Sequence, residues 1–108
     1  MGWDSGTKSF TANGAVGTSD SSGVAKPIIV WDLALVGGGT ATSVTLYDGG
    51  STAADPVLRA SVSSSGSLLE GDNFISTNGI YCPNGCFLAF KTAATATTAT
   101  VSFREDNI

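Results

Sequence analysis

The chain has 108 residues, with nine acidic and five basic side chains, no histidine and a net charge of −4 at neutral pH. Only 13% of the residues are charged, against about 25% in ordinary globular proteins, whereas serine, threonine and glycine supply 41 of the 108 positions. The hydrophobic fraction of 42% is too high for intrinsic disorder and suits one small domain with a modest core. The scattered cations argue against a nucleic-acid partner, because such surfaces depend on clustered Lys and Arg.

The N-terminal residues contain no basic stretch followed by an apolar run, so the sequence predicts no secretory signal peptide and synthesis in a cytoplasm. The longest apolar run, around residues 28–36, is interrupted by Asp32. It is far shorter than the roughly 18 to 20 residues that a membrane helix needs. We therefore predict neither a membrane span nor a membrane partner.

Residues 1–25 differ in composition from the rest, and they predict an N-terminal arm with a Gly/Ser linker ahead of a single β-sandwich domain at residues 26–108. Residues 8–12 can form a strand, but residues 13–23 (NGAVGTSDSSG) have the composition of a flexible linker. Trp3 and Phe10 are the large apolar side chains of this arm. They either fold back onto the edge of the domain's own core or anchor on a neighbouring subunit, since aromatic side chains are effective interface anchors.

The most apolar segment, residues 27–36 (PIIVWDLALV), alternates with a period of two and predicts a strand. Its two faces carry Ile29, Trp31, Leu33 and Leu35 on one side and Ile28, Val30, Ala34 and Val36 on the other. A strand that is apolar on both faces needs cover on both sides. We expect Trp31 in the core, and we take Ile28 and Val30, together with Trp3 and Phe10, as candidate interface residues.

Further strands follow at intervals of about 8 to 12 residues, separated by turn residues. They are predicted at residues 42–48, 56–62, 67–70, 73–76, 79–82, 85–91 and 97–104. Residues 27–36 and 42–48 are expected to pair as a hairpin, and residues 79–82 to pair with 85–91. Since helical spacing is almost absent, the sequence predicts an all-β protein, an antiparallel β-sandwich of seven or eight strands of the jelly-roll or Greek-key kind.

Alternation in two of these strands also predicts which side chains face the core. Val44, Leu46, Ala99, Val101 and Phe103 are expected to point inward. Hydroxyl groups are expected to point outward at Thr45, Ser61, Thr98, Thr100 and Ser102. The low charge and the outward hydroxyls together indicate a surface suited to stationary packing against other chains.

Cys82 and Cys86 flank Pro83-Asn84-Gly85, which predicts a tight turn because Pro presets φ and Asn-Gly tolerates positive φ. Residues on either side of such a turn lie near disulfide distance, whereas synthesis in a cytoplasm favours reduced thiols. The sequence therefore leaves two alternatives for these cysteines, a Cys82–Cys86 disulfide or a pair of buried free thiols. A zinc site is not expected, because two cysteines without any histidine leave the metal short of four ligands.

The residues that could carry chemistry form no catalytic constellation. Without histidine, neither a Ser-His-Asp nor a Cys-His arrangement can be built. The glycine run at residues 37–39 is not followed by the Gly-Lys-Ser/Thr of a phosphate-binding loop. The acidic candidates lie beside turn residues, where carboxylates stabilise turns; they are Asp48, Asp55, Glu70 and Asp72. We predict that the protein is not an enzyme, binds no metal and needs no cofactor.

Four segments from residue 41 onward carry a resemblance to a known class of proteins. They are VTLYDGG at residues 44–50, PVL at 56–58, NGIY at 78–81 and the Thr-rich strand at 97–103. Over about 60 residues, this combination resembles small virion structural proteins of tailed phages, marine phages in particular. The resemblance implies a capsid decoration or cement protein built as a β-sandwich and located on the capsid surface. Its implied partners are the major capsid protein and neighbouring copies of itself, in a homo-oligomer on the particle.

A second class of function also stays open. The chain can instead be a carbohydrate-binding or adhesive β-sandwich module, such as a tail, knob or fibre component. In that case Tyr47, Tyr81 or an exposed tryptophan would supply the surface on which a sugar ring stacks.

Overall fold

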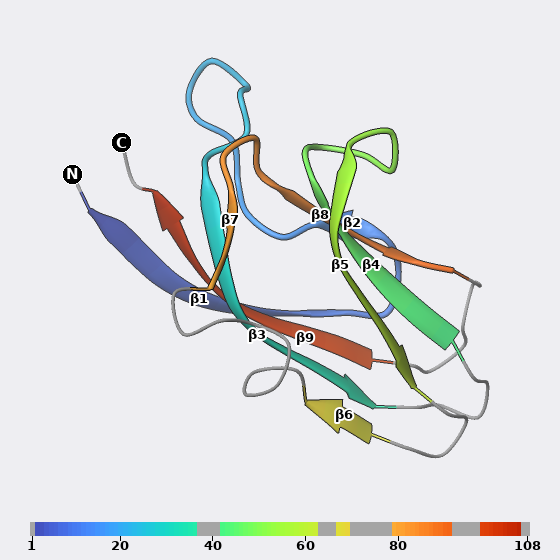
Figure 1. Ribbon diagram of the computed structural model, residues 1–108. Coiled ribbons are helices and arrows are strands. Elements are labelled where there is room, and N and C mark those ends of the chain that lie inside the picture. The colour runs from blue at the N-terminus through green and yellow to red at the C-terminus, as the bar shows by residue number, and fades with distance from the viewer. Residues whose placement is uncertain (1, 37–41, 63–66, 70–78, 92–97, 107–108) are drawn as a thin grey trace.

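The computed structural model of the chain describes residues 2–36, 42–62, 67–69, 79–91 and 98–106 (Figure 1). These ranges contain no helix. They form nine strands: β1 (Trp3–Phe10), β2 (Gly14–Ala15), β3 (Ile28–Val36), β4 (Thr42–Asp48), β5 (Asp55–Val62), β6 (Ser67–Leu69), β7 (Ile80–Cys82), β8 (Cys86–Phe90) and β9 (Thr98–Asp106). The strand predicted at residues 73–76 and the acidic residues Glu70 and Asp72 lie outside the described residues.

The strands form two antiparallel sheets. The five-stranded sheet has the order β1-β9-β3, with β6 and β7 both pairing with β3, and the four-stranded sheet has the order β2-β8-β4-β5. The prediction of an all-β antiparallel β-sandwich is confirmed. The strand count exceeds the predicted seven or eight because two strands, β1 and the two-residue β2, lie in the segment predicted as arm and linker.

Strand pairing is nested along the chain: β1 pairs with β9, β2 with β8, β3 with β6 and β7, and β4 with β5. This nesting is the pairing order of a jelly roll. Both predicted hairpins are wrong, because β3 and β4 lie in different sheets, as do β7 and β8. The predictions paired strands that are neighbours in sequence, whereas in a nested arrangement the chain crosses to the other sheet after most strands.

A β-bulge in β3 explains why buried side chains lie at both even and odd positions of this strand. The register of β3 against β9 shifts between Val30 and Asp32. Ile28 and Val30 before the shift and Leu33 and Leu35 after it are all fully buried. An additional residue in one strand moves the alternation by one position, so these four side chains face the same core. Trp31, at the bulge, is 47% exposed, and the expectation that it lies in the core is wrong.

The core fills the space between the two sheets. Four of the side chains predicted to point inward, Val44, Leu46, Ala99 and Val101, are buried, and Phe103 packs against them. The remaining buried hydrophobic residues among those described are Phe10, Val16, Ile28, Val30, Leu33, Leu35, Ala60, Cys82, Cys86, Leu88 and Ala89. The strands in which apolar and polar residues alternate, such as β4 and β9, therefore turn their apolar face toward this core.

The N-terminal segment is part of the sandwich, which differs from the predicted arm and linker. β1 runs antiparallel to β9 along its whole length, from Trp3 opposite Asp106 to Phe10 opposite Ala99 (Figure 1). β2 pairs with β8, so residues before 25 supply an edge strand to each sheet. The predicted linker contains a turn, in which the Asp20 carboxylate accepts hydrogen bonds from the backbone N–H groups of Ser22 and Val24 at 2.8 and 3.0 Å.

Candidate functional site

Of the four candidate interface residues, three have buried side chains and one has an exposed side chain. Phe10, Ile28 and Val30 lie in the domain's own core, so in this structure they are not available for contact with another chain. Phe10 reaches the core because β1 folds back along β9, and Ile28 and Val30 because of the bulge in β3. Trp3, at the start of β1, is 42% exposed.

The outer face of the five-stranded sheet carries an exposed aromatic patch, which contains Tyr81 and an exposed tryptophan, the residue types considered above for sugar stacking. Tyr81 on β7 is directly opposite Ile29 on β3, which is directly opposite Arg104 on β9. Directly opposite residues share one face of a sheet. Tyr81 is 57% exposed, and Trp31 lies two positions from Ile29 on the same strand. We call Ile29, Trp31 and Tyr81 the aromatic patch.

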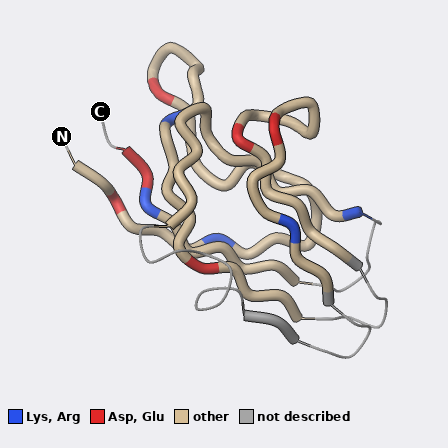
Figure 2. The backbone as a smooth tube through the Cα atoms, viewed as in Figure 1, with Lys and Arg blue, Asp and Glu red and all other residues tan. Residues whose placement is uncertain are grey.

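Next to the aromatic patch, the same face is covered by hydroxyl groups. Thr7 on β1 is opposite Ser102 on β9, and Ser9 is opposite Thr100. The hydroxyl oxygens of Ser9 and Thr100 are 3.0 Å apart and share a hydrogen bond. Figure 2 shows how sparsely charged residues are distributed along the described backbone. The face can therefore bind by stacking and by neutral hydrogen bonds.

Asp32 is the carboxylate nearest to the aromatic patch in sequence, and it lies opposite Ser102. Its Oδ1 atom is buried and has no hydrogen-bond partner. A buried polar atom without a partner is uncommon and calls for an explanation, such as a missing donor. Among the described residues, no group of three or more His, Cys, Asp and Glu side chains could hold a metal ion.

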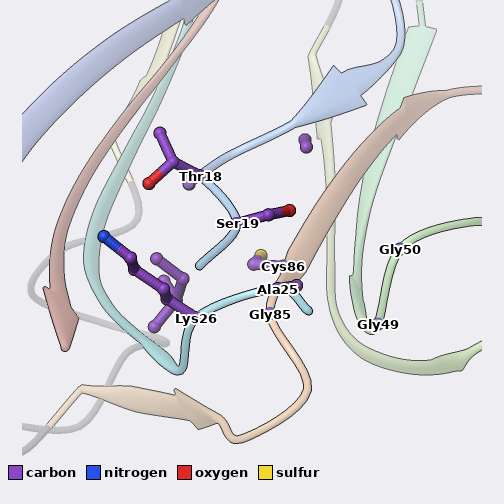
Figure 3. Close-up of a pocket in the computed structure, with 11 residues that line it drawn as sticks. Thr18, Ser19, Ala25, Lys26, Gly49, Gly50, Gly85 and Cys86 are labelled. Atoms are coloured by element: carbon purple, nitrogen blue, oxygen red, sulfur yellow. The ribbon is translucent and has the colours of Figure 1, made fainter. Parts of the chain in front are cut away.

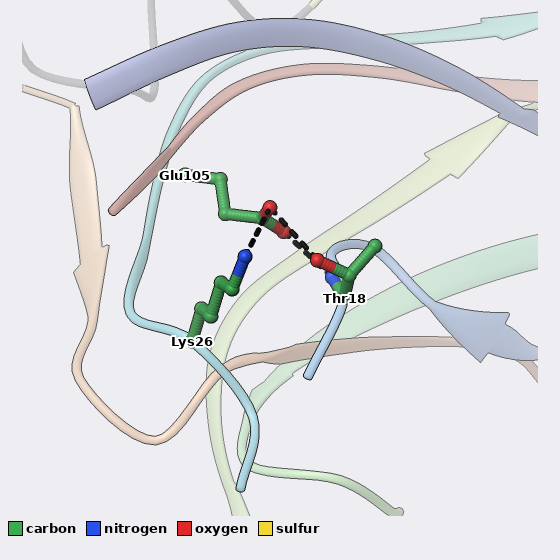
Figure 4. Close-up of polar contacts among 3 residues, drawn as sticks. All are labelled: Thr18, Lys26 and Glu105. Carbon is green, nitrogen blue, oxygen red and sulfur yellow. Dashed lines mark hydrogen bonds and ion pairs between the residues drawn. The ribbon is translucent and has the colours of Figure 1, made fainter. Parts of the chain in front are cut away.

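One end of the sandwich is closed by a polar cluster around Glu105 (Figure 4). The Glu105 carboxylate accepts hydrogen bonds from the backbone N–H of Thr18 at 2.6 Å and from the Thr18 hydroxyl at 2.8 Å. The Lys26 ammonium lies 3.9 Å from the same carboxylate. These contacts join β9 to the segment between β2 and β3. The sequence gives no signal for this cluster, because Thr18 and Lys26 lie 79 or more residues away from Glu105 along the chain.

We expect Glu105→Gln to lower the free energy of unfolding by about 1 to 3 kcal/mol, because it weakens two hydrogen bonds to a charged acceptor. Urea denaturation measures the change. Asp55→Asn is the matched control, since Asp55 is an exposed carboxylate at the start of β5. Equal unfolding midpoints for the two variants would show that the Glu105 contacts do not stabilise the fold.

A small cavity lies beside this cluster (Figure 3). It has a volume of about 40 Å³ and is lined by residues that include Gly17, Thr18, Lys26, Gly85 and Cys86. That volume holds about one or two water molecules, whereas pockets for organic ligands measure about 300 to 1,000 Å³. The cavity is therefore not a site for an organic substrate.

Cys82 and Cys86 are buried free thiols that contact each other across the turn. The turn is as predicted: the Gly85 N–H donates to the Cys82 carbonyl at 3.2 Å, and Gly85 has a φ of +88°. The Cys86 thiol is the donor and the Cys82 sulfur the acceptor of a hydrogen bond between the two side chains. This hydrogen bond raises the pKa of Cys86, burial raises it further, and the same bond lowers the pKa of Cys82.

We expect Cys86→Ala to raise the pKa of Cys82, because the substitution removes the donor that stabilises the Cys82 thiolate. The ultraviolet absorbance of the thiolate, followed against pH, measures this. Cys82→Ala is the control. In this variant Cys86 is the remaining thiol, and it should titrate at a higher pH than Cys82 does in the native chain. Identical titration of Cys82 with and without the Cys86 thiol would rule out the hydrogen bond as the cause.

Comparison with known proteins finds no protein-family model, no curated protein and no solved structure that matches this chain. In the part of the chain that the structure describes, no helix is long and apolar enough to cross a membrane.

Proposed function

We propose that this protein is a virion structural protein of a tailed phage, a capsid decoration or cement protein that binds the outer capsid surface and stabilises it. The observation that carries the proposal is the aromatic patch on the outer sheet face, where it adjoins Arg104 and the hydroxyl groups of β1 and β9. The aromatic side chains would anchor the sandwich on the major capsid protein, because aromatic residues contribute strongly to interface energies.

Low charge and a rigid sandwich also favour this role. A protein held on a particle works through static contacts, and many weak contacts repeated over a lattice add up through avidity. The resemblance of the strand ends to virion proteins gives the same expectation. Neighbouring copies of the chain on the capsid are further partners under this proposal.

The test uses particles made from a phage genome that lacks the gene for this chain. Purified protein is mixed with them and sedimented, and bound protein is quantified. We expect Trp31→Ala/Tyr81→Ala to weaken binding more than tenfold, since each central aromatic anchor contributes about 2 kcal/mol or more. Its thermal unfolding should stay nearly unchanged, because both side chains are exposed.

Val24→Ala is the matched control for this experiment, because Val24 is an exposed apolar residue outside the five-stranded sheet. It should bind particles as the native chain does. Equal binding by the native chain and the double variant, or no binding by the native chain, would refute the proposal. Deleting residues 1–20 is not a useful alternative, because it removes β1 and β2 from the sheets.

A second candidate function is carbohydrate binding by the same face. The specific observation is the exposed Trp31 ring beside the Asp32 carboxyl group in the sequence. A sugar could stack on the aromatic ring, and its hydroxyl groups could form hydrogen bonds with the Thr and Ser hydroxyls of β1 and β9 on the same face. A glycan array decides: binding to a defined glycan that Trp31→Ala abolishes would favour this function, and silence across the array would exclude it for the glycans printed.

A further inference from the structure

The free edge of β1 is the longest uninterrupted sheet edge among the described strands. β1 has eight residues, and its register with β9 is unbroken from Trp3 to Phe10. No described strand pairs with its other side. β5 is also an eight-residue edge strand, but it contains Pro56 and a register shift, both of which hinder pairing with another strand. β2, β6 and β7 have only two or three residues.

The charged residues of β1 are placed symmetrically about Gly6. Asp4 and Lys8 lie two residues before and two residues after it. If two β1 strands pair antiparallel with Gly6 opposite Gly6, Asp4 of each copy lies opposite Lys8 of the other. Every other antiparallel register loses these two pairs, and registers centred on Asp4 or Lys8 place like charges opposite each other. Opposite charges at directly opposite positions stabilise a sheet, and like charges destabilise it.

The surroundings of Gly6 and Lys8 are compatible with this register. Gly6 is directly opposite Phe103, and a Cβ atom at Gly6 would come within 2.9 Å of the Phe103 ring. The residue on the axis therefore carries no side chain, and the Phe103 ring occupies the space on the inner face of the sheet beside it. The Lys8 ammonium donates one hydrogen bond, to the Ala15 carbonyl at 3.0 Å. An ammonium has three donors, so Lys8 can also reach a carboxylate of a second copy.

We propose that two copies of this chain associate through their β1 edges, antiparallel about a two-fold axis at Gly6, with two Asp4–Lys8 ion pairs between the copies. The pairing joins two five-stranded sheets into one continuous sheet, and its interface is isologous. A single pair of strand edges buries less than the roughly 1,200 Å² of a standard stable interface. The dimer is therefore weak and depends on chain concentration and salt.

Charge exchange tests the proposal on the purified full-length chain by sedimentation equilibrium at low salt. The native chain should dimerise as its concentration rises. D4K and K8D should each remain monomeric, because each places like charges opposite each other twice. An equimolar mixture of D4K and K8D should form a one-to-one heterodimer, and the double variant D4K/K8D should again form a homodimer. Circular dichroism melting checks that each variant is folded.

A second experiment does not depend on Lys8. In the proposed register Ser5 of one copy lies opposite Thr7 of the other, and both residues are exposed. S5C/T7C should therefore give covalent dimers under mild oxidation, whereas T11C, at an exposed position beyond β1, should give far fewer. A native chain that stays monomeric at millimolar concentration, a mixture of D4K and K8D that stays monomeric, or equal cross-linking of S5C/T7C and T11C would overturn the proposal. These outcomes leave particle binding untouched, so they do not depend on the proposed function.

Discussion

Leu33→Ala is expected to lower the free energy of unfolding by about 2 to 5 kcal/mol, the range for removing a buried leucine side chain from a packed core. Val30→Ala is expected to destabilise as well, by a smaller amount, because fewer methyl groups are lost. Both side chains are fully buried although they lie three positions apart on one strand, on opposite faces of a regular alternation. Urea denaturation, read as a change in the free energy of unfolding, measures both effects.

The loss of unfolding free energy in Trp31→Ala is compared with the loss in Leu33→Ala. A tryptophan in the core would cost about 3 to 5 kcal/mol on truncation, whereas an exposed one at the bulge should cost less than about 1 kcal/mol. If Trp31→Ala destabilises the protein more than Leu33→Ala, β3 has no bulge in solution and the arrangement described for its two halves is incorrect.

Gly79→Ala is expected to destabilise the fold for two independent reasons. Gly79 has a φ of +80°, a left-handed conformation that costs an L side chain about 1 to 2 kcal/mol. A Cβ atom there would also lie 2.8 Å from the Val30 carbonyl oxygen and 2.6 Å from an Ile29 methyl group. Crowding against a packed strand adds about 1 to 3 kcal/mol. Thermal or urea unfolding of the variant gives the total.

Gly50→Ala is the matched control, since no atom lies within 4 Å of a Cβ at that position and its φ is not positive. Its effect should stay within about 0.5 kcal/mol. Similar losses for Gly50→Ala and Gly79→Ala would mean that neither the backbone conformation nor the contact with Val30 matters at Gly79.

Local features of the fold could be predicted from the sequence because they depend on neighbouring residues. Alternation located β4 and β9 and their inward side chains, for example Val44 and Val101. The Pro83-Asn84-Gly85 segment predicted a turn, and Gly85 does adopt a positive φ. In each case, the chemistry of the segment itself determines its conformation.

Strand partners could not be predicted, because they are set by contacts between distant residues. β3 pairs with β9, about 70 residues later in the chain, and nothing in either segment specifies the other. Only the end of β1 was predicted as a strand, at residues 8–12, for a related reason. The first part of β1 contains Asp4 and Gly6, residue types that are depleted in strands, and it forms because the backbone of β1 pairs with β9 along eight residues. Tertiary pairing overrides local preference in such strands.

Trp31 was wrongly predicted to lie in the core because the bulge in β3 was not recognised. A regular alternation groups Trp31 with Leu33 and Leu35, which are buried, and so places the tryptophan in the core. Asp32 was the available signal: a carboxylate in the middle of a strand that is apolar on both faces. A shift of one residue at this point brings Ile28, Val30, Leu33 and Leu35 to the same side and leaves Trp31 outside.

A cryo-electron microscopy map of tailed particles that carry this chain tests the central claim most directly, because it shows location, orientation and partner together. The account predicts the two-sheet sandwich on the outer capsid surface, with Trp31 and Tyr81 against the major capsid protein. A sandwich that contacts the capsid through its four-stranded sheet, that lies elsewhere on the particle, or that is absent from the particle would contradict it.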